Sequence, residues 1–349
     1  MKLLSLLHRW TGALVGLLLA LLGLTGAILV WKGEWVMLPG AGDPVIEDVG
    51  AIAAITERAQ AERGLSRITF ASDEIGLHQL VFADGSGAYV RQDGTVVARW
   101  TSQWERPELW LFELHHQLFA GEIGETVTGM AGIAGVLFVV TGLLLWWRTR
   151  RRFKLRLLPE RFRPGPIIRH HRDLGAFAAP LLLVTMLTGV LMLFAPLRTA
   201  LIGVEVRPKE TLRVSPGFGV AEVLALAKLR FPDASFRRIT LPAKAGDPMA
   251  VRMRQPFEWT PNGRTQVSVA ADGKITVEDA ATANGSASLS EKAYPVHSAK
   301  AGGLVWKIAM TFSGVALSIL GLLASWSFWT RRVGRARQPT QMIATEPAR

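Results

Sequence analysis

The chain has 349 residues, a formal net charge of +12 and no cysteine. The lack of cysteine excludes disulfides, iron–sulfur clusters, thiol catalysis and thioether attachment of haem. Hydrophobic residues make up 49% of the chain, which is ordinary for a soluble protein, but here they concentrate in runs. The four runs are Thr11–Trp31, Thr126–Trp147, Leu174–Leu197 and Leu304–Trp329. Each is close to the ~20 residues that a helix needs to cross the ~30 Å core of a lipid bilayer, so we predict four membrane helices.

The first apolar run, within residues 1–31, follows Lys2 and Arg9, as the apolar part of a secretory signal peptide would. It is longer than such a segment usually is, and no small-x-small cleavage site follows it. We therefore expect an uncleaved first membrane helix.

Basic residues cluster before the first run, between the second and third runs, and after the fourth. In the linker 148–173, the stretch from Arg148 to Arg172 has ten Lys or Arg and one acidic residue, Glu160, and the tail 330–349 is also basic. The positive-inside rule places these clusters and both termini in the cytoplasm. Nucleic-acid binding by the linker is disfavoured, because the linker lies between two membrane spans.

Two long segments, residues 32–125 and 198–303, then lie on the other side of the membrane. Each is predicted to contain one helix followed by four short strands, which makes a small α+β domain. In the first segment the helix covers 52–63 and the strands lie near 67–71, 77–83, 88–91 and 96–99. In the second the helix covers 220–230 and the strands lie near 237–241, 250–254, 266–270 and 274–277. Asp-Gly turns at 93–94 and 272–273 favour hairpins.

The two halves of the chain align without a gap where the first and third membrane helices begin. His8 aligns with His171, Gly12 with Gly175, and the Leu-Thr-Gly of residues 24–26 with that of residues 187–189. The fold class predicted is therefore a mainly α membrane protein, a bundle of four transmembrane helices from an internal duplication, with two small α+β domains outside it.

Six of the seven histidines lie at the predicted entrances of these helices. One set is His8 with His170 and His171, and the other is His115 and His116 with His297. Two sets at opposite faces of the membrane favour two bis-histidine sites, because noncovalent haem depends on axial nitrogen ligands and apolar packing. The alternatives are polar residues at the membrane interface and, less favoured, a zinc site, for which no clustered Cys, His or carboxylate set is evident.

Small residues accompany the histidines and would leave room for a flat macrocycle. Gly12 and Gly175 lie four residues after His8 and His171, while Gly121 and Gly303 lie six residues after His115 and His297. The repeat alignment favours His171 over His170. Equal spacing to a glycine favours His115 over His116, although His116 to Gly121 also matches His297 to Gly302.

These motifs together resemble the PepSY-associated transmembrane family of bacterial inner-membrane proteins, which are often iron-regulated and include ferrisiderophore reductases. The matching stretches are Leu7–Gly12, Leu114–Gly124, His171–Gly175 and His297–Gly303. The resemblance implies PepSY-like periplasmic domains and haem-mediated electron transfer across the inner membrane. Two positions depart from the family pattern: Ala299 stands where a glycine is common, and Glu125 where a basic residue is common.

The resulting hypothesis is an inner-membrane dihaem b oxidoreductase, with iron ligands His8 and His171 at the cytoplasmic face and His115 and His297 at the periplasmic face. Electrons from a cytoplasmic reductase or quinol would reach a ferric siderophore or another ferric chelate in the periplasm. No Gly-x-Gly-x-x-Gly nucleotide loop is present, so the donor must be separate. The alternative is a non-catalytic PepSY sensor or regulator that binds a periplasmic partner. A transporter lacks support, because the helix centres carry no charge.

Overall fold

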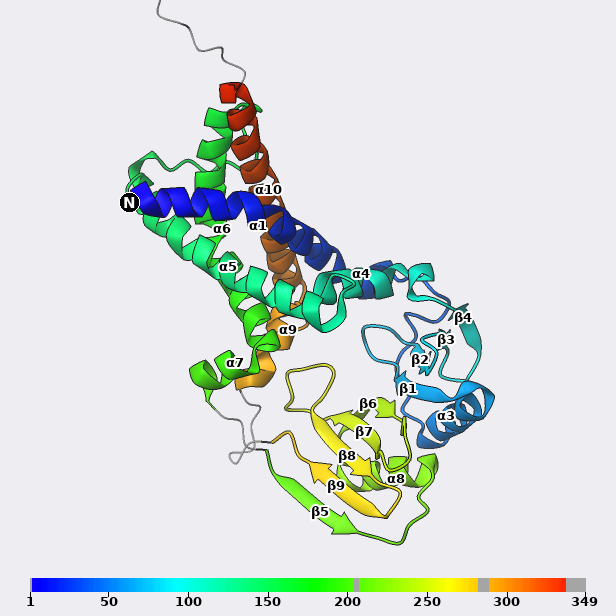
Figure 1. Ribbon diagram of the computed structural model, residues 1–349. Helices are drawn as coiled ribbons and strands as arrows, with labels where there is room; N and C mark the ends of the chain where they lie inside the picture. Colours follow the sequence, from blue (N-terminus) through cyan, green and yellow to red (C-terminus); the bar gives the residue numbers. More distant parts are fainter. Residues whose placement is uncertain (1, 204–206, 282–288, 337–349) are drawn as a thin grey trace, which may run out of the picture.

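The computed structural model describes residues 2–203, 207–281 and 289–336. Long helices form a bundle, and one β-sheet with its covering helices lies at one end of it (Figure 1). The start of the first helix, the basic linker and the end of the last helix lie at the other end. We call these two ends the sheet side and the linker side. The predicted basic tail beyond residue 336 lies outside the described residues.

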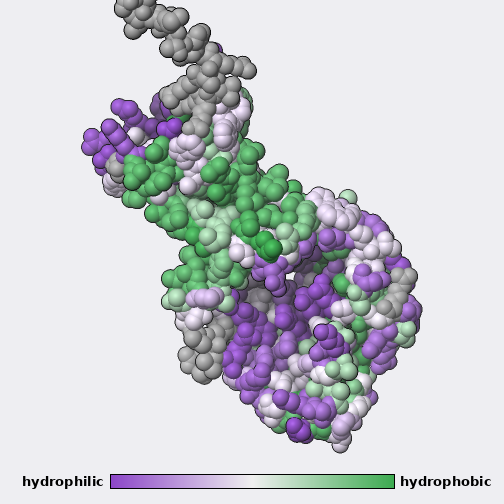
Figure 2. Space-filling view, in the orientation of Figure 1, coloured by the Kyte–Doolittle hydropathy of each residue, from purple (hydrophilic) through white to green (hydrophobic). Residues whose placement is uncertain are grey.

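The bundle contains α1 (Lys2–Leu29), α5 (Gly121–Trp147), α6 (Pro164–Leu193) and α10 (Gly303–Ala336). All four helices are long and apolar enough to cross a membrane, which confirms the four predicted spans. Figure 2 shows a hydrophobic band across the visible face of the bundle, with hydrophilic surface on either side of it. The helices begin earlier than the apolar runs, because polar residues at their ends continue the same backbone hydrogen bonding.

Glycines let α1 and α10 cross closely. A Cβ atom on Gly23 would lie 2.6 Å from the carbonyl oxygen of Gly314, and one on Gly16 would lie 3.3 Å from that of Gly321. Without a hydrophobic force between helices in lipid, such close packing holds membrane helices together. Gly16 therefore packs against another helix.

Among the described residues the sheet has nine strands in the order β4-β3-β2-β1-β6-β7-β8-β9-β5, and every neighbouring pair is antiparallel. The first half of the chain supplies β1 (Leu65–Thr69), β2 (His78–Phe82), β3 (Gly87–Val90) and β4 (Val96–Trp100). The second half supplies β5 (Lys209–Arg213), β6 (Ser235–Thr240), β7 (Met249–Arg254), β8 (Thr265–Val269) and β9 (Lys274–Glu278). The α+β units predicted for the two segments thus join through β1 and β6 into one sheet.

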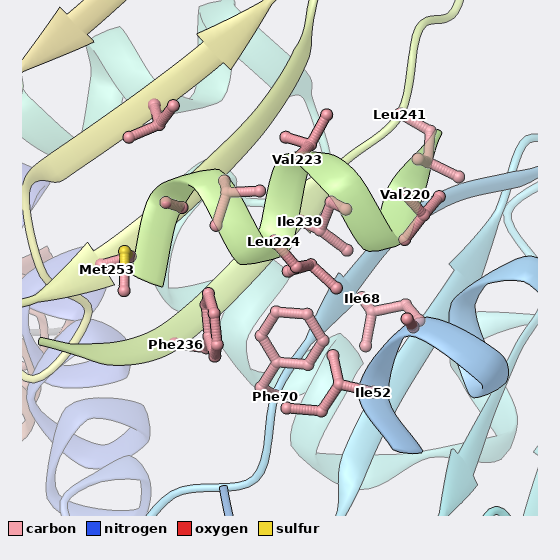
Figure 3. Close-up of a cluster of buried hydrophobic side chains, with 14 of the residues drawn as sticks. Ile52, Ile68, Phe70, Val220, Val223, Leu224, Phe236, Ile239, Leu241 and Met253 are labelled. Carbon is pink, nitrogen blue, oxygen red and sulfur yellow. The ribbon is translucent and has the colours of Figure 1, made fainter. Parts of the chain in front are cut away.

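One hydrophobic core serves both halves. α3 (Val49–Arg63) and α8 (Val220–Arg230) cover the same face of the sheet, and their apolar side chains meet those of the strands (Figure 3). Ile68 of β1 pairs with Ile239 of β6, and both are fully buried. Burial of such a side chain stabilises the fold by about 1.5–3 kcal/mol, so the shared core fixes the two halves to each other.

Short helices lie between the sheet and the bundle: α2 (Lys32–Trp35), α4 (Pro107–Gln117), α7 (Ala195–Ile202) and α9 (Ala293–His297). A left-handed turn separates α4 from α5, with Leu118 at φ 50° and Gly121 at φ 55°. The same kind of turn separates α9 from α10, with Ala299 at φ 57° and Gly303 at φ 62°. Ala299 therefore adopts a backbone conformation that favours glycine.

Candidate functional site

The linker-side pair consists of His8 on α1 and His171 on α6. Their ring centroids are 6.4 Å apart, with the ring planes at 80°. The Nδ1 atom of His8 lies 2.8 Å from the hydroxyl of Thr141 on α5. That hydroxyl donates its hydrogen to the Leu137 carbonyl at 2.7 Å, so it accepts a hydrogen from His8 Nδ1. The Nε2 atom of His8 then keeps its lone pair, as a metal-binding imidazole requires.

The sheet-side pair consists of His115, near the end of α4, and His297, at the end of α9. Their ring centroids are 6.2 Å apart, with the planes at 42°. His297 Nδ1 lies 3.0 Å from the Thr185 carbonyl, which can only accept. His115 Nδ1 lies 2.9 Å from the Thr25 hydroxyl, which donates to the Leu21 carbonyl at 2.9 Å. Both rings thus carry their hydrogen on Nδ1 and leave Nε2 free.

A repeated Thr-Gly step on α1 and α6 receives these two rings. The glycine of each step leaves the space that the ring occupies. A Cβ on Gly26 would lie 3.0 Å from Cε1 of His115, and one on Gly189 would lie 3.0 Å from Cε1 of His297. The threonine of each step lies 17 residues after the linker-side histidine on the same helix. At 1.5 Å per residue, the two pairs are about 25 Å apart along the bundle, close to the thickness of the hydrocarbon core.

Both pairs have the spacing of two imidazoles that share one metal ion. Nitrogen–metal bonds of about 2 Å place the centroids of two opposed rings roughly 6 Å apart. The centroid distances of 6.2 and 6.4 Å match this spacing. A structural zinc site needs four protein ligands. In the described parts of the chain, no three His, Cys, Asp or Glu side chains gather closely enough to hold a metal ion. Two neighbouring imidazoles at this spacing between apolar helices suit a haem iron, which needs only two ligands from the protein.

The neighbouring histidines make other contacts. His170 is fully buried, and its Nε2 atom lies 3.0 Å from the Leu157 carbonyl of the linker. His116 stacks on Phe112 of its own helix, with centroids 5.5 Å apart and planes at 9°. Neither ring belongs to a pair, so the geometry distinguishes His171 from His170 and His115 from His116.

A buried carboxylate ties the linker to the start of α6. Asp173 is fully buried, and its two oxygens contact Arg156 of the linker and Arg172 of the same helix. The Arg172 guanidinium also donates to the Arg152 carbonyl at 3.0 Å. Because a buried carboxylate is costly without partners, this network holds the linker close to the linker-side pair.

The four glycines that were predicted to leave room for a macrocycle lie in two kinds of place. Around Gly12 a Cβ would meet no atom within 4 Å, and at Gly175 it would reach only the Leu320 side chain at 3.9 Å. Gly121 and Gly303 begin α5 and α10 in the left-handed conformation, so they take part in the turns that follow the sheet-side histidines. A Cβ would thus have space at Gly12 and Gly175, whereas Gly121 and Gly303 have a positive φ at the turns before α5 and α10.

Sequence reasoning missed the residues that orient the rings. The Leu-Thr-Gly repeat predicts the alignment of the two halves, and its threonines and glycines also lie against His115 and His297. Thr141 and Gly142 on α5 play the corresponding part for His8, since a Cβ on Gly142 would lie 3.6 Å from Cε1 of His8. The signal available was the recurrence of Thr-Gly one membrane thickness away from a histidine.

Fold and site together define a multi-pass membrane protein with an α+β sheet outside the bundle and a histidine pair at each end of it. The profile of the PepSY-associated TM region matches residues 5–332, nearly the whole chain. The chain belongs to this family. No curated protein matches it.

Proposed function

We propose that the chain is a dihaem b oxidoreductase of the bacterial inner membrane that passes electrons from the cytoplasmic side to a ferric chelate, such as a ferric siderophore, in the periplasm. The observation that carries this proposal is the presence of two histidine pairs with metal-binding spacing at opposite ends of one bundle. A single structural metal site would need no second pair about 25 Å away.

In this proposal His8 and His171 hold one noncovalent b haem, and His115 and His297 hold the other. Haem supplies one-electron chemistry when bound. The chain supplies imidazole Nε2 atoms, and the Thr25, Thr141 and Thr185 oxygens fix their orientation. The apolar helices keep water away from the rings.

The basic linker supports a cytoplasmic position for the linker side, and the sheet is then periplasmic. The membrane potential, negative inside, favours outward electron movement by about 2.3 kcal/mol per electron for each 100 mV. The sheet also offers a docking surface for a bulky chelate. The repeated order of elements in the two halves is consistent with an internal duplication.

Haem content tests the cofactor part of the proposal. The purified full-length chain should contain two b haems by pyridine haemochrome assay, and His8→Ala and His171→Ala should each remove the same one. The matched controls are His170→Ala and His116→Ala, which should keep both haems. A colourless wild-type protein that is correctly folded would refute the proposal and favour a regulator.

Topology and direction need two further measurements. Because the chain has no cysteine, Thr95→Cys in the sheet region and Lys154→Cys in the linker give single labelling sites. An impermeant maleimide should label only Thr95→Cys in spheroplasts. In proteoliposomes with reductant inside, ferric chelate outside should become Fe(II), and haem-loaded protein that reduces no chelate would refute the reductase activity.

A further inference from the structure

On the face of the sheet opposite α3 and α8, arginines gather on β1, β6 and β7. Arg238 of β6 lies directly opposite Arg252 of β7, and on its other side it lies opposite Thr69 of β1. Arg67 precedes Thr69 by two residues on β1 and therefore points to the same face. Figure 2 shows hydrophilic surface around the hollow between the sheet and the bundle. We call Arg67, Arg238 and Arg252 the arginine row.

The arginine row is electrostatically unfavourable as it stands. Like charges directly opposite each other on neighbouring strands destabilise a sheet. None of the three guanidinium groups has a hydrogen bond or ion pair with a described residue. By contrast, Arg230 on α8 pairs with Glu210 at 2.6 Å. Burial, with Arg67 and Arg252 nearby, lowers the pKa of Arg238. A bound anion would relieve this repulsion.

The arginine row adjoins a cavity. Most of its lining is basic or polar, with two acidic and two apolar residues: Arg237, Arg238, Arg254, Thr69, Ser72, Asn262, Asp73, Glu74, Phe70 and Pro261. The Nε atom of Arg237 is buried there without a hydrogen-bond partner. Asp73 and Glu74 reduce the net charge of the lining, but Glu74 is paired with Lys300. Arg254 is engaged by the Glu258 carbonyl, so Arg237 Nε is the cavity donor that a ligand would satisfy.

The same face reaches the sheet-side histidine pair. Arg238 lies close enough to Tyr294 of α9 for the two to interact electrostatically. Tyr294 precedes His297 by three residues on the same short helix. Lys300, which follows the helix, has its Nζ atom 5.7 Å from the centre of the Tyr294 ring. A ligand on the arginine row is thus next to the element that carries one of the proposed haem ligands.

We propose that the arginine row binds the ferric chelate and selects chelates with a net negative charge, such as iron held by catecholates or carboxylates. This inference rests on the proposed function. A guanidinium donates two parallel hydrogen bonds to the paired oxygens of such ligands, a geometry that lysine does not match. Neutral trihydroxamate chelates offer no charge to relieve the repulsion within the row.

Gallium(III) chelates separate binding from reduction, because they have the charge and shape of the iron chelates but accept no electron. Titration of the full-length protein in nanodiscs should detect binding of a trianionic gallium tris-catecholate, at least about tenfold tighter than that of a neutral gallium trihydroxamate. Binding of the trianion should weaken as salt is added. Equal affinity for both chelates would overturn the inference, and so would full competition by inorganic phosphate at equal ionic strength. Neither outcome depends on electron transfer.

Substitutions locate the site. Arg238→Gln and Arg252→Gln should each weaken binding of the trianion about tenfold or more, the usual effect of losing a charge-assisted hydrogen bond. Arg238→Lys should recover part of the loss. Arg58→Gln on α3, at the opposite face, is the control with the same charge change and should bind as the wild type. If all four proteins bind equally, the site lies elsewhere.

Discussion

The sharpest prediction concerns a glycine that the structure places against a proposed ligand. In Gly26→Ala the new Cβ would lie 3.0 Å from Cε1 of His115, whereas an ordinary carbon–carbon contact is about 3.5–4.0 Å. The ring must then give by a few tenths of an ångström. Metal ligands tolerate distance changes of only about 0.2 Å, so the sheet-side site should bind its metal more weakly.

The expected loss is about 10–100-fold in haem affinity at the sheet-side pair, as for other changes in the residues that orient a ligand. The linker-side pair should be unaffected. The matched control is Gly142→Ala, whose Cβ would lie 3.6 Å from Cε1 of His8, an ordinary contact. Gly189→Ala should reproduce the effect of Gly26→Ala, because its Cβ would lie 3.0 Å from His297.

Haem transfer to excess apomyoglobin measures this loss. Gly26→Ala and Gly189→Ala should release one haem quickly and the other at the wild-type rate, while Gly142→Ala should behave as the wild type. Equal release rates for all three variants would show that the ring contacts do not determine haem retention. Simultaneous loss of both haems would indicate general misfolding, which a thermal unfolding scan detects independently.

Three further predictions test the fold. Burial lowers the pKa of His78 from 6.5 to about 4, and its Nδ1 accepts the Ala71 N–H at 3.0 Å. As the pH falls, the unfolded chain therefore binds this proton before the folded chain does. About 3 kcal/mol of unfolding free energy should be present above pH 6.5 and lost between pH 6.5 and 4. In His78→Asn, the unfolding free energy from chemical denaturation should not show this fall. Gly23→Val should separate α1 from α10, where a Cβ already meets the Gly314 oxygen at 2.6 Å, and should cost at least about 1–3 kcal/mol of stability by the same measurement; unchanged stability would contradict the close crossing. Asp173→Asn should destabilise the attachment of the linker, because it removes the negative charge of the buried carboxylate that Arg156 and Arg172 contact, and limited proteolysis should then cleave the linker faster than in the wild type.

The bundle was predictable because membrane length and hydropathy are local properties of the sequence. The helix expected over 220–230 matches α8, and the Asp-Gly turns lie where β3 meets β4 and β8 meets β9. The joining of the two halves was not predictable, because the pairing of Ile68 with Ile239 connects strands far apart in the chain. Strand periodicity gives the face of each residue and says nothing about its distant partner.

The sheet-side histidines show a second limit. His115 and His297 were expected at the entrances of the membrane helices, but each lies on a separate short helix before a turn. In the first turn Leu118 and Phe119 have φ of 50° and 59°, conformations that their side chains disfavour. Tertiary contacts impose such angles, so residue preferences cannot reveal them.

The Thr-Gly steps explain why a motif alone could not identify the residues around the pairs. Thr-Gly occurs at 11–12, 25–26, 128–129, 141–142 and 188–189. A Cβ on Gly129 would meet Phe194 at 2.6 Å, whereas Gly26 and Gly189 face histidines. The same two residues therefore serve either helix packing or ring placement, and the choice depends on which neighbouring element reaches them. At the sheet side, the neighbouring elements are the short helices α4 and α9. They place His115 against Gly26 and His297 against Gly189, so these two Thr-Gly steps serve ring placement.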